Sequence, residues 1–368
     1  MVSTRPEIVP APKQGFQQTV DSDSPCFAKV LEWDAKSIPI EDLRFEKLSI
    51  RDIPNGEMPT LPLGFFVKEG KRVTSVPEGN GHAATEEADD EDVVRWQRLN
   101  TFTVHPDIGK GLFSKALGKL EGKGMTNAKN VMKAITTFLA VGYENCPPAI
   151  ETIGGMPLKE VARLYGNSAQ RMFEEAYIAD IATMMVGVRL ATRGRTYAAT
   201  MNCPVRNCSN VCKELCSMDT LNIKVVPDLK NKPIFRVELD HGIFDGMGKI
   251  RKVYFSPLKF YQMDVYFKTN VTAAEMLEKS IVAIPESEVY GLSRSSNPFN
   301  EDLYDRLESS GEDQRTLIQS LQKIRPGPDA GFKITCECGE RELTYPLAWS
   351  MQPLEFLYFS NMFPESDD

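Results

Sequence analysis

The chain has 368 residues, of which 42% are hydrophobic, and a formal net charge of −8 with a pI near 5.3. This length and composition allow a substantial buried core, divided among about two or three domains. The acidic balance argues against broad binding to nucleic-acid phosphates. No apolar run approaches the ~18–20 residues that span a bilayer, and the N-terminus shows no apolar signal segment. We therefore expect a cytoplasmic protein with reduced thiols.

Changes in composition divide the chain into five segments. In order, they are a flexible proline-rich arm (1–26), a mixed α/β segment (27–95) containing an acidic loop (77–92), a central domain of helices followed by strands (96–300), amphipathic helices with a linker (301–331), and a C-terminal module (332–368). The predicted fold class is α+β. We expect an irregular, multi-part fold with a helical central region, antiparallel strands and a zinc-ribbon-like C-terminal module.

The first predicted elements after the arm are extended. Residues 61–76 resemble two strands around a turn at Glu69 and Gly70, and residues 93–99 form a short strand or helix that presents Trp96. A helix is predicted after Thr126, because its apolar residues recur at steps of three and four; they are Val131, Ile135, Phe138 and Leu139.

Residues 156–194 have a strongly helical pattern that contains two charged residues, Asp180 and Arg189. Charged side chains are seldom buried without partners, so we expect each of them to reach a partner elsewhere in the fold. Gly194 is predicted to end the helix, and the next residues lead into a cysteine cluster as a strand.

Strands are predicted through residues 221–268, including the aromatic stretch 260–267, and Thr272 is expected to cap a helix. Asp240, His241 and Asp245 follow one another closely near glycine turns, where a catalytic or metal site is conceivable. The chain contains only three histidines, and neither a second histidine nor an evident nucleophile accompanies this group. The sequence therefore favours a protein that is not an enzyme.

Six of the eight cysteines fall into two clusters, Cys203–Cys216 and Cys336–Cys338, about 120 residues apart. Structural Zn²⁺ binds four ligands in a tetrahedron and accepts thiolates readily. The favoured ligands are Cys203, Cys208, Cys336 and Cys338, which would connect the two distant segments. Buried free thiols and disulfides remain alternatives. Cys212 and Cys216 are either replacement ligands or small buried groups.

Residues of about 150–290 resemble the zinc-containing baseplate proteins of contractile-tailed phages, in particular the T-even-type hub and hub assembly proteins, and related contractile injection particles. The matching positions are Asp180, Arg189, Gly194, Tyr197, Cys203, Pro204 and Cys208. This resemblance implies a non-catalytic structural or assembly component within a hetero-oligomeric complex of other baseplate and tail proteins. It also implies a location in the host cytoplasm during assembly, and in the virion tail if the protein is retained.

A zinc-ribbon factor that binds nucleic acid is the alternative function. The sequence offers some basic residues between Lys232 and Phe255. The net acidity argues against this function, as does the absence of basic residues interleaved with aromatic residues near the cysteines.

Overall fold

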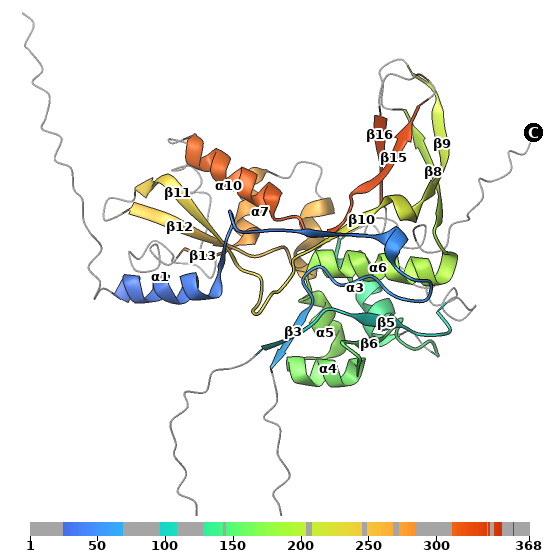
Figure 1. The fold of residues 1–368 in the computed structure, drawn as a ribbon, viewed down its shortest axis with the longest axis horizontal. Coiled ribbons are helices and arrows are strands. Elements are labelled where there is room, and N and C mark those ends of the chain that lie inside the picture. Colours follow the sequence, from blue (N-terminus) through green and yellow to red (C-terminus); the bar gives the residue numbers. More distant parts are fainter. Residues whose placement is uncertain are drawn as a thin grey trace, which may run out of the picture.

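The computed structural model describes residues 25–68, 96–108, 128–142, 145–203, 208–244, 249–267, 272–284, 311–336, 338, 342–347 and 356. Within them, helices combine with small, mainly antiparallel sheets, so the α+β prediction is confirmed (Figure 1). Residues 1–24 of the predicted arm 1–26, the acidic loop 77–92 and most of the residues after Leu347 lie outside this part of the chain. The last two residues of the predicted arm belong to a helix that begins at Pro25. None of the described helices is long and apolar enough to cross a membrane.

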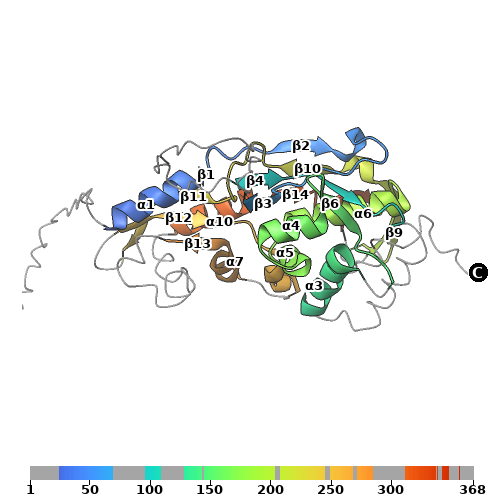
Figure 2. The same cartoon turned by 90° about the horizontal axis from the view of Figure 1, so that it is seen from below.

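Four helices form the centre of the molecule, and Figure 2 shows three of them, α3 to α5, together below the sheets. They are α3 (Ala128–Thr136), which continues as a π-helical turn (Thr137–Val141), α4 (Leu158–Tyr165), α5 (Ala169–Glu174) and α6 (Ile178–Arg193). Every residue of α6 from Asp180 to Arg189 is buried. A helix buried all round belongs to the core, and α6 accordingly organises the fold.

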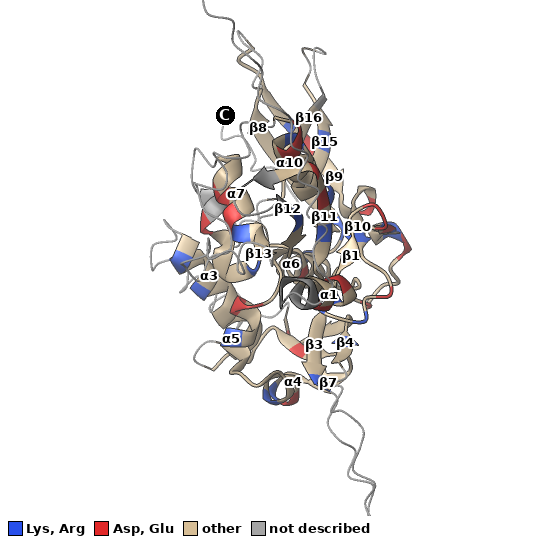
Figure 3. Ribbon diagram, turned by 90° about the vertical axis from the view of Figure 1, so that its left-hand side faces the viewer, with Lys and Arg blue, Asp and Glu red and all other residues tan. Residues whose placement is uncertain are grey.

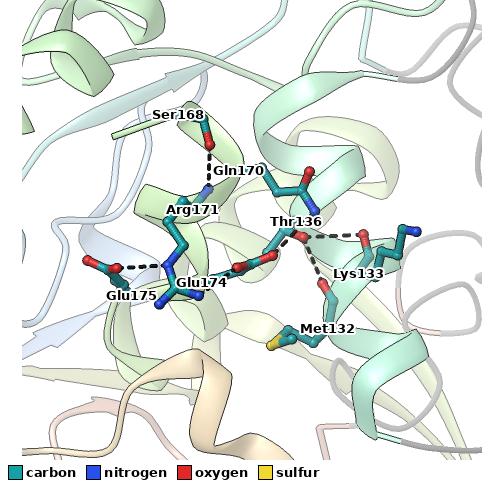
Figure 4. Close-up of polar contacts among 8 residues, drawn as sticks. All are labelled: Met132, Lys133, Thr136, Ser168, Gln170, Arg171, Glu174 and Glu175. Atoms are coloured by element: carbon teal, nitrogen blue, oxygen red, sulfur yellow. Dashed lines mark hydrogen bonds and ion pairs between the residues drawn. The ribbon is translucent and has the colours of Figure 1, made fainter. Parts of the chain in front are cut away.

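Local contacts stabilise the start of α5 and the end of α3 (Figure 4). Ser168 caps α5 by accepting a hydrogen bond from the backbone N–H of Arg171 at 3.2 Å. The Arg171 guanidinium pairs with Glu174 and Glu175, three and four residues further on. In α3, the hydroxyl of the buried Thr136 donates to backbone carbonyl oxygens of the preceding turn, which satisfies it without a tertiary partner.

Short strands surround these helices. One sheet has the order β1 (Ile38–Pro39), β11 (Phe235–Phe244), β12 (Lys249–Phe255), β13 (Ile281–Ala283), in which only the β1–β11 pair is parallel. A second has the order β14 (Gly327–Pro328), β10 (Asn222–Val225), β2 (Glu46–Ser49), and a third has β5 (Phe102–Val104), β6 (Ile150–Ile153), β7 (Met156–Pro157). A two-stranded pair joins β3 (Phe65–Lys68) to β4 (Trp96–Leu99).

Two further hairpins stand side by side at one end of the molecule and project from it (Figures 1 and 3). The first hairpin consists of β8 (Thr196–Asn202) and β9 (Val211–Ser217), and the second of β15 (Gly331–Thr335) and β16 (Glu342–Pro346). The segments are about 120 residues apart in the sequence, so their packing is a long-range feature of the fold.

Two large groups of buried side chains form the core. The main cluster joins α3 to α6 with the inner faces of both hairpins. The second cluster joins β11, β12 and β13 to α7 (Ala273–Ser280) and α10 (Glu312–Lys323). The remaining elements are α1 (Pro25–Lys36) and the 3₁₀ turns η1 (Ile50–Asp52), η3 (Met218–Thr220) and η4 (Phe260–Phe267).

Several predicted elements are confirmed. The apolar residues expected to face the core from α3 and the turn after it are buried, Gly194 ends α6, and Thr272 begins α7 with a capping box. The first strand of the predicted 61–76 hairpin pairs with β4, while residues 69–76 lie outside the described part. Residues 96–99 form β4, so the helical alternative is wrong for them, while residues 93–95 lie outside the described part.

The strand predicted at 260–267 is wrong, because η4 occupies these residues. Its aromatic composition favours a strand. However, Phe260 and Met263 are both buried and three residues apart, which matches the three-residue repeat of a 3₁₀ helix. The backbone N–H of Phe260 also donates to the carbonyl oxygen of Ala176 at 2.7 Å, which holds η4 against the start of α6 instead of in a sheet.

Candidate metal centre

Four thiols meet where the two projecting hairpins lie together. The Sγ atoms of Cys203, Cys208, Cys336 and Cys338 all lie within 4.8 Å of one another. Two come from the first hairpin and two from the second, and two sulfur–sulfur contacts cross between the hairpins. Cys203 Sγ is 3.9 Å from Cys338 Sγ, and Cys208 Sγ is 3.8 Å from Cys336 Sγ. The four cysteines chosen from the sequence are therefore the four that the fold brings together.

The first hairpin positions its cysteines through its register. Asn202 pairs with Val211 at the end of the ladder, and the next residue, Cys203, donates its backbone N–H to the carbonyl oxygen of Asn210 at 3.0 Å. The ladder therefore extends to the first cysteine, and Cys208 lies on the return segment before β9. Cys203 is buried and Cys208 is half-buried, so the two thiols point into the contact between the hairpins.

The second hairpin presents its two cysteines in a tight C-x-C arrangement. Thr335 pairs with Glu342 at the end of its ladder, and Cys336 follows directly. The backbone N–H of Cys338 donates to the sulfur of Cys336 and, with hydrogen bonds from neighbouring thiols, lowers the pKa of Cys336 to about 6 against the effect of burial. Pro204, which follows Cys203, and Gly339, which follows Cys338, lie outside the described residues.

The geometry of the donors fits a tetrahedral metal ion. A Zn–S distance of ~2.3 Å in a regular tetrahedron places the sulfurs ~3.8 Å apart, close to the separations of 3.9 and 3.8 Å for Cys203–Cys338 and Cys208–Cys336. A disulfide requires an S–S distance of ~2.0 Å, so the disulfide alternative does not match these pairs. The described cysteines are all free thiols. Cys203, Cys208, Cys336 and Cys338 could together hold a metal ion.

An aromatic group lies beneath the thiols and connects both hairpins to α6. The Tyr197 ring on β8 packs against Phe332 and Tyr345 of the second hairpin, with ring centroids 5.2 and 5.8 Å apart. The Arg189 guanidinium lies 4.4 Å from the centre of the Tyr197 ring and donates to the carbonyl oxygens of Thr196 and Phe356. The buried Arg189 therefore fixes the base of the first hairpin, and the prediction that it reaches a partner is confirmed.

The two remaining cysteines of the first cluster occupy one inner face of β9. Cys212 and Cys216 are both buried, and the alternation of the strand places both on the same face of β9. Cys212 donates a hydrogen bond to Cys336, and burial, that bond and the nearby thiols raise the pKa of Cys212 to about 11. Cys216 lies four residues from Cys212 and its thiol faces the carbonyl oxygen of Glu214. The contact between Cys212 and Cys336 was not predicted from the sequence. The two-residue repeat of a strand nevertheless places Cys212 on the inner face of β9.

Asp180 is also buried and has partners, as predicted, but it does not belong to the metal centre. Its carboxylate accepts hydrogen bonds from the backbone N–H groups of Leu63 and Gly64 at 2.9 and 3.0 Å. Asp180 therefore connects the beginning of α6 to the segment before β3. No feature of the sequence near Leu63 indicates this contact, because the donors are backbone groups.

The described residues around His241 make contacts between elements of the fold. His241 Nε2 lies 2.9 Å from a carboxylate oxygen of Glu312, its backbone N–H donates to Asp313, and its side chain is 59% exposed. Asp240 is the preceding residue of β11, and Asp245 lies outside the described residues. His82 also lies outside them. The described residues of this group form a contact between β11 and the start of α10.

Comparison with models of known protein families, with curated proteins and with solved structures finds no match.

Proposed function

We propose that this chain is a non-catalytic structural or assembly component of a contractile phage tail baseplate, or of a related injection particle, and that its four clustered cysteines form a structural zinc site. The observation that carries this proposal is the convergence of two thiols from each of two hairpins far apart in the sequence. The metal would fasten the C-terminal module to the central domain.

A structural role for the metal follows from the donor set. Four thiolates complete a tetrahedron and leave no open position for a water molecule or a substrate. A two-stranded hairpin is marginally stable by itself, and each of these hairpins contains only two strands in the described part of the chain. Because metal binding to a site that exists only in the folded state adds to folding free energy, zinc would stabilise both hairpins together.

The resemblance to baseplate proteins supplies the biological setting. Three of its positions, Arg189, Tyr197 and Cys203, lie in one structural unit that runs from α6 through β8 to the thiols. Asp180 anchors the other end of α6. These residues hold elements of the fold together instead of lining a substrate site. Their placement therefore supports a structural role for the motif.

Elemental analysis tests the metal part of the proposal. Purified under reducing conditions, the full chain is expected to contain about one equivalent of zinc, with the four clustered thiols protected from a thiol reagent. A Cys336→Ser, Cys338→Ser variant is the matched control and should lose the metal. Less than about half an equivalent in the unmodified chain, together with freely reactive thiols, would contradict a zinc site.

Isolation of tail assemblies tests the baseplate part. A tagged copy of the chain expressed during phage infection should co-purify with baseplates or with their assembly intermediates, and the double variant should not. Electron microscopy of the isolated particles would locate the tag. Recovery of the chain only outside such particles would contradict this assignment while leaving the zinc result unaffected.

Zinc ribbons also serve in proteins that bind nucleic acid, and a pair of hairpins sharing four cysteines is the feature that favours this alternative. In the ribbon of Figure 3, the positions of Lys and Arg and those of Asp and Glu are interspersed along the described elements, without a continuous run of basic positions in that view. A gel-shift experiment with DNA and RNA at two salt concentrations distinguishes the functions. Salt-dependent binding would favour the nucleic-acid factor.

A further inference from the structure

A large open cavity lies between the two core clusters, away from the thiols. Its volume is about 820 Å³. Its described lining residues come from the start of α6, from η4, α7 and α10, and from the segment 324–330, in which Arg325 and Ala330 are exposed. Pockets of 300–1,000 Å³ that lie between packed units are the usual sites for small ligands.

The walls of the cavity are mainly apolar. Ala179 and Ala182 line it from α6, Met263 from η4, Met276 from α7, and Leu321 from α10. The alanines leave room where larger side chains would fill the space, and methionine side chains adapt to ligands of irregular shape. An apolar chain or ring would therefore remain out of water along most of its length in this cavity.

Two cations, the half-buried Lys224 and the exposed Arg325, line the cavity. Lys224 on β10 is paired in register with Gly327 on β14, and Arg325 precedes Gly327 by two residues. Both line the cavity, and neither side chain is seen in an ion pair within the part of the chain that the structure describes. The one acidic residue among the described lining residues, Asp329, accepts two hydrogen bonds from Asn222, at 2.9 and 3.1 Å. This part of the cavity wall therefore has a positive charge available for an anion.

The wall also contains a polar group without a partner. Ser280 at the end of α7 is 1% exposed, and its hydroxyl finds no hydrogen-bond partner among the described residues. A buried hydroxyl without a partner costs free energy. The hydroxyl oxygen is itself buried, so a ligand in the cavity does not reach it.

We infer that this cavity binds a long-chain carboxylate, with its apolar chain along α6, α7 and α10 and its carboxylate at Lys224 and Arg325. The positive charges of Lys224 and Arg325 and the apolar walls together select this class of molecule. The inference is independent of the zinc site, because no cysteine lines the cavity within the described residues.

Titration of the full, zinc-loaded chain with palmitate tests the inference. After removal of co-purified lipid, one palmitate is expected to bind per chain at concentrations below those at which palmitate self-associates. Hexadecylamine, which has the same chain and the opposite charge, should bind at least about tenfold more weakly, because Lys224 and Arg325 would repel it. Equal affinity for the two molecules, or no saturable binding of palmitate, would overturn the inference.

Variants then locate the binding. A Lys224→Met, Arg325→Met double variant keeps the aliphatic stems and should bind palmitate at least about tenfold more weakly. Lys213→Met, on the exposed face of β9, is the matched control and should bind as the unmodified chain does. Ala182→Phe should block the cavity. Unchanged affinity in the double variant, with its fold confirmed by circular dichroism, would contradict the proposed position of the carboxylate.

Discussion

Asp180 holds a carboxylate at the beginning of α6 with no exposure to solvent. Burial raises its pKa to about 6, although the N–H groups of Leu63 and Gly64 and the nearby Arg98 favour ionisation. Arg98 in turn donates to the carbonyl oxygens of Pro62 and Leu63, so this carboxylate and this guanidinium hold the same short segment from two sides. The position of β3 against α6 thus depends on two ionisable groups, Asp180 and Arg98.

The raised pKa of Asp180 predicts a specific pH dependence of stability. Between the ordinary pKa of 3.8 and about 6, the folded protein binds a proton that the unfolded chain has released. Folding is therefore favoured at low pH, and this contribution is lost as the pH rises through 6; its full size is about 3 kcal/mol. Urea unfolding of the wild type and of Asp180→Asn at pH 4 to 7 should show the wild type losing that amount relative to the variant.

Asp34 provides a control of opposite sign. Burial disfavours its ionisation, but hydrogen bonds from Lys252, Tyr254 and Arg236 outweigh burial and lower its pKa below 3.8. Its stabilising contribution is present above pH 4 and is lost as the pH falls through the lowered pKa. Asp34→Asn should therefore remain parallel to the wild type from pH 5 to 7. Parallel curves for Asp180→Asn as well would contradict the prediction for Asp180.

Cysteine substitutions distinguish ligands from neighbours. Cys203 is one of the four mutually close thiols, whereas Cys212 lies on β9 beside Cys336 and outside that group of four. Cys203→Ser should reduce bound zinc below about half an equivalent, because serine replaces a strong thiolate ligand with a weak one. Cys212→Ser should retain about one equivalent after dialysis. The reverse result would assign the ligand to Cys212 and exclude Cys203.

At the scale of elements, α6 approaches β5 more closely than a side chain allows. A Cβ atom added at Gly187 would lie 2.6 Å from the Cζ atom of Phe102, a buried ring on β5. Alanine is normally better than glycine in a helix by about 1 kcal/mol. At this position we expect the opposite: Gly187→Ala should destabilise the protein by about 1–3 kcal/mol, measured by urea unfolding, since the contact is overpacked.

A double-mutant cycle checks the cause of this effect. In a Phe102→Leu background, the smaller side chain removes the ring atom that meets the new Cβ, and the cost of Gly187→Ala should fall by at least about 1 kcal/mol. An equal cost in both backgrounds would assign the effect to the helix itself and contradict the packing explanation.

The elements also show what the sequence predicts and what it does not. The arms of the C-terminal hairpin, the strand into Cys203 and the end of α6 follow from local patterns, because alternation, a C-x-C turn and a helix-ending glycine are short-range signals. The partner of β3 and the donors to Asp180 are not predictable in this way. They depend on backbone groups and strands distant in sequence, which leave no pattern near the residues they contact. The cysteines are the exception, since their chemistry marks a long-range contact.

At the scale of the whole molecule, the two core clusters relate differently to the metal centre. The hairpins contribute to the main cluster through Tyr197, Phe332 and Leu343, among others, whereas the second cluster around β11 and β12 contains no residue of either hairpin. Both clusters remain covered without the metal, because most of their buried side chains come from helices and sheets that do not contact the thiols. Metal loss is therefore expected to act on one end of the molecule.

Hydrogen exchange measures this difference. Removal of zinc with a chelator under reducing conditions should speed amide exchange in β8, β9, β15 and β16 by at least about tenfold, since two-stranded ladders open readily without the crosslink. Exchange in β11 and β12, which pair with each other in a larger sheet, should remain unchanged. The Cys336→Ser, Cys338→Ser variant should give the same pattern with zinc present. Uniformly faster exchange would mean that the metal stabilises the whole chain, and no change would mean that the hairpins hold together through Tyr197 and its aromatic neighbours alone.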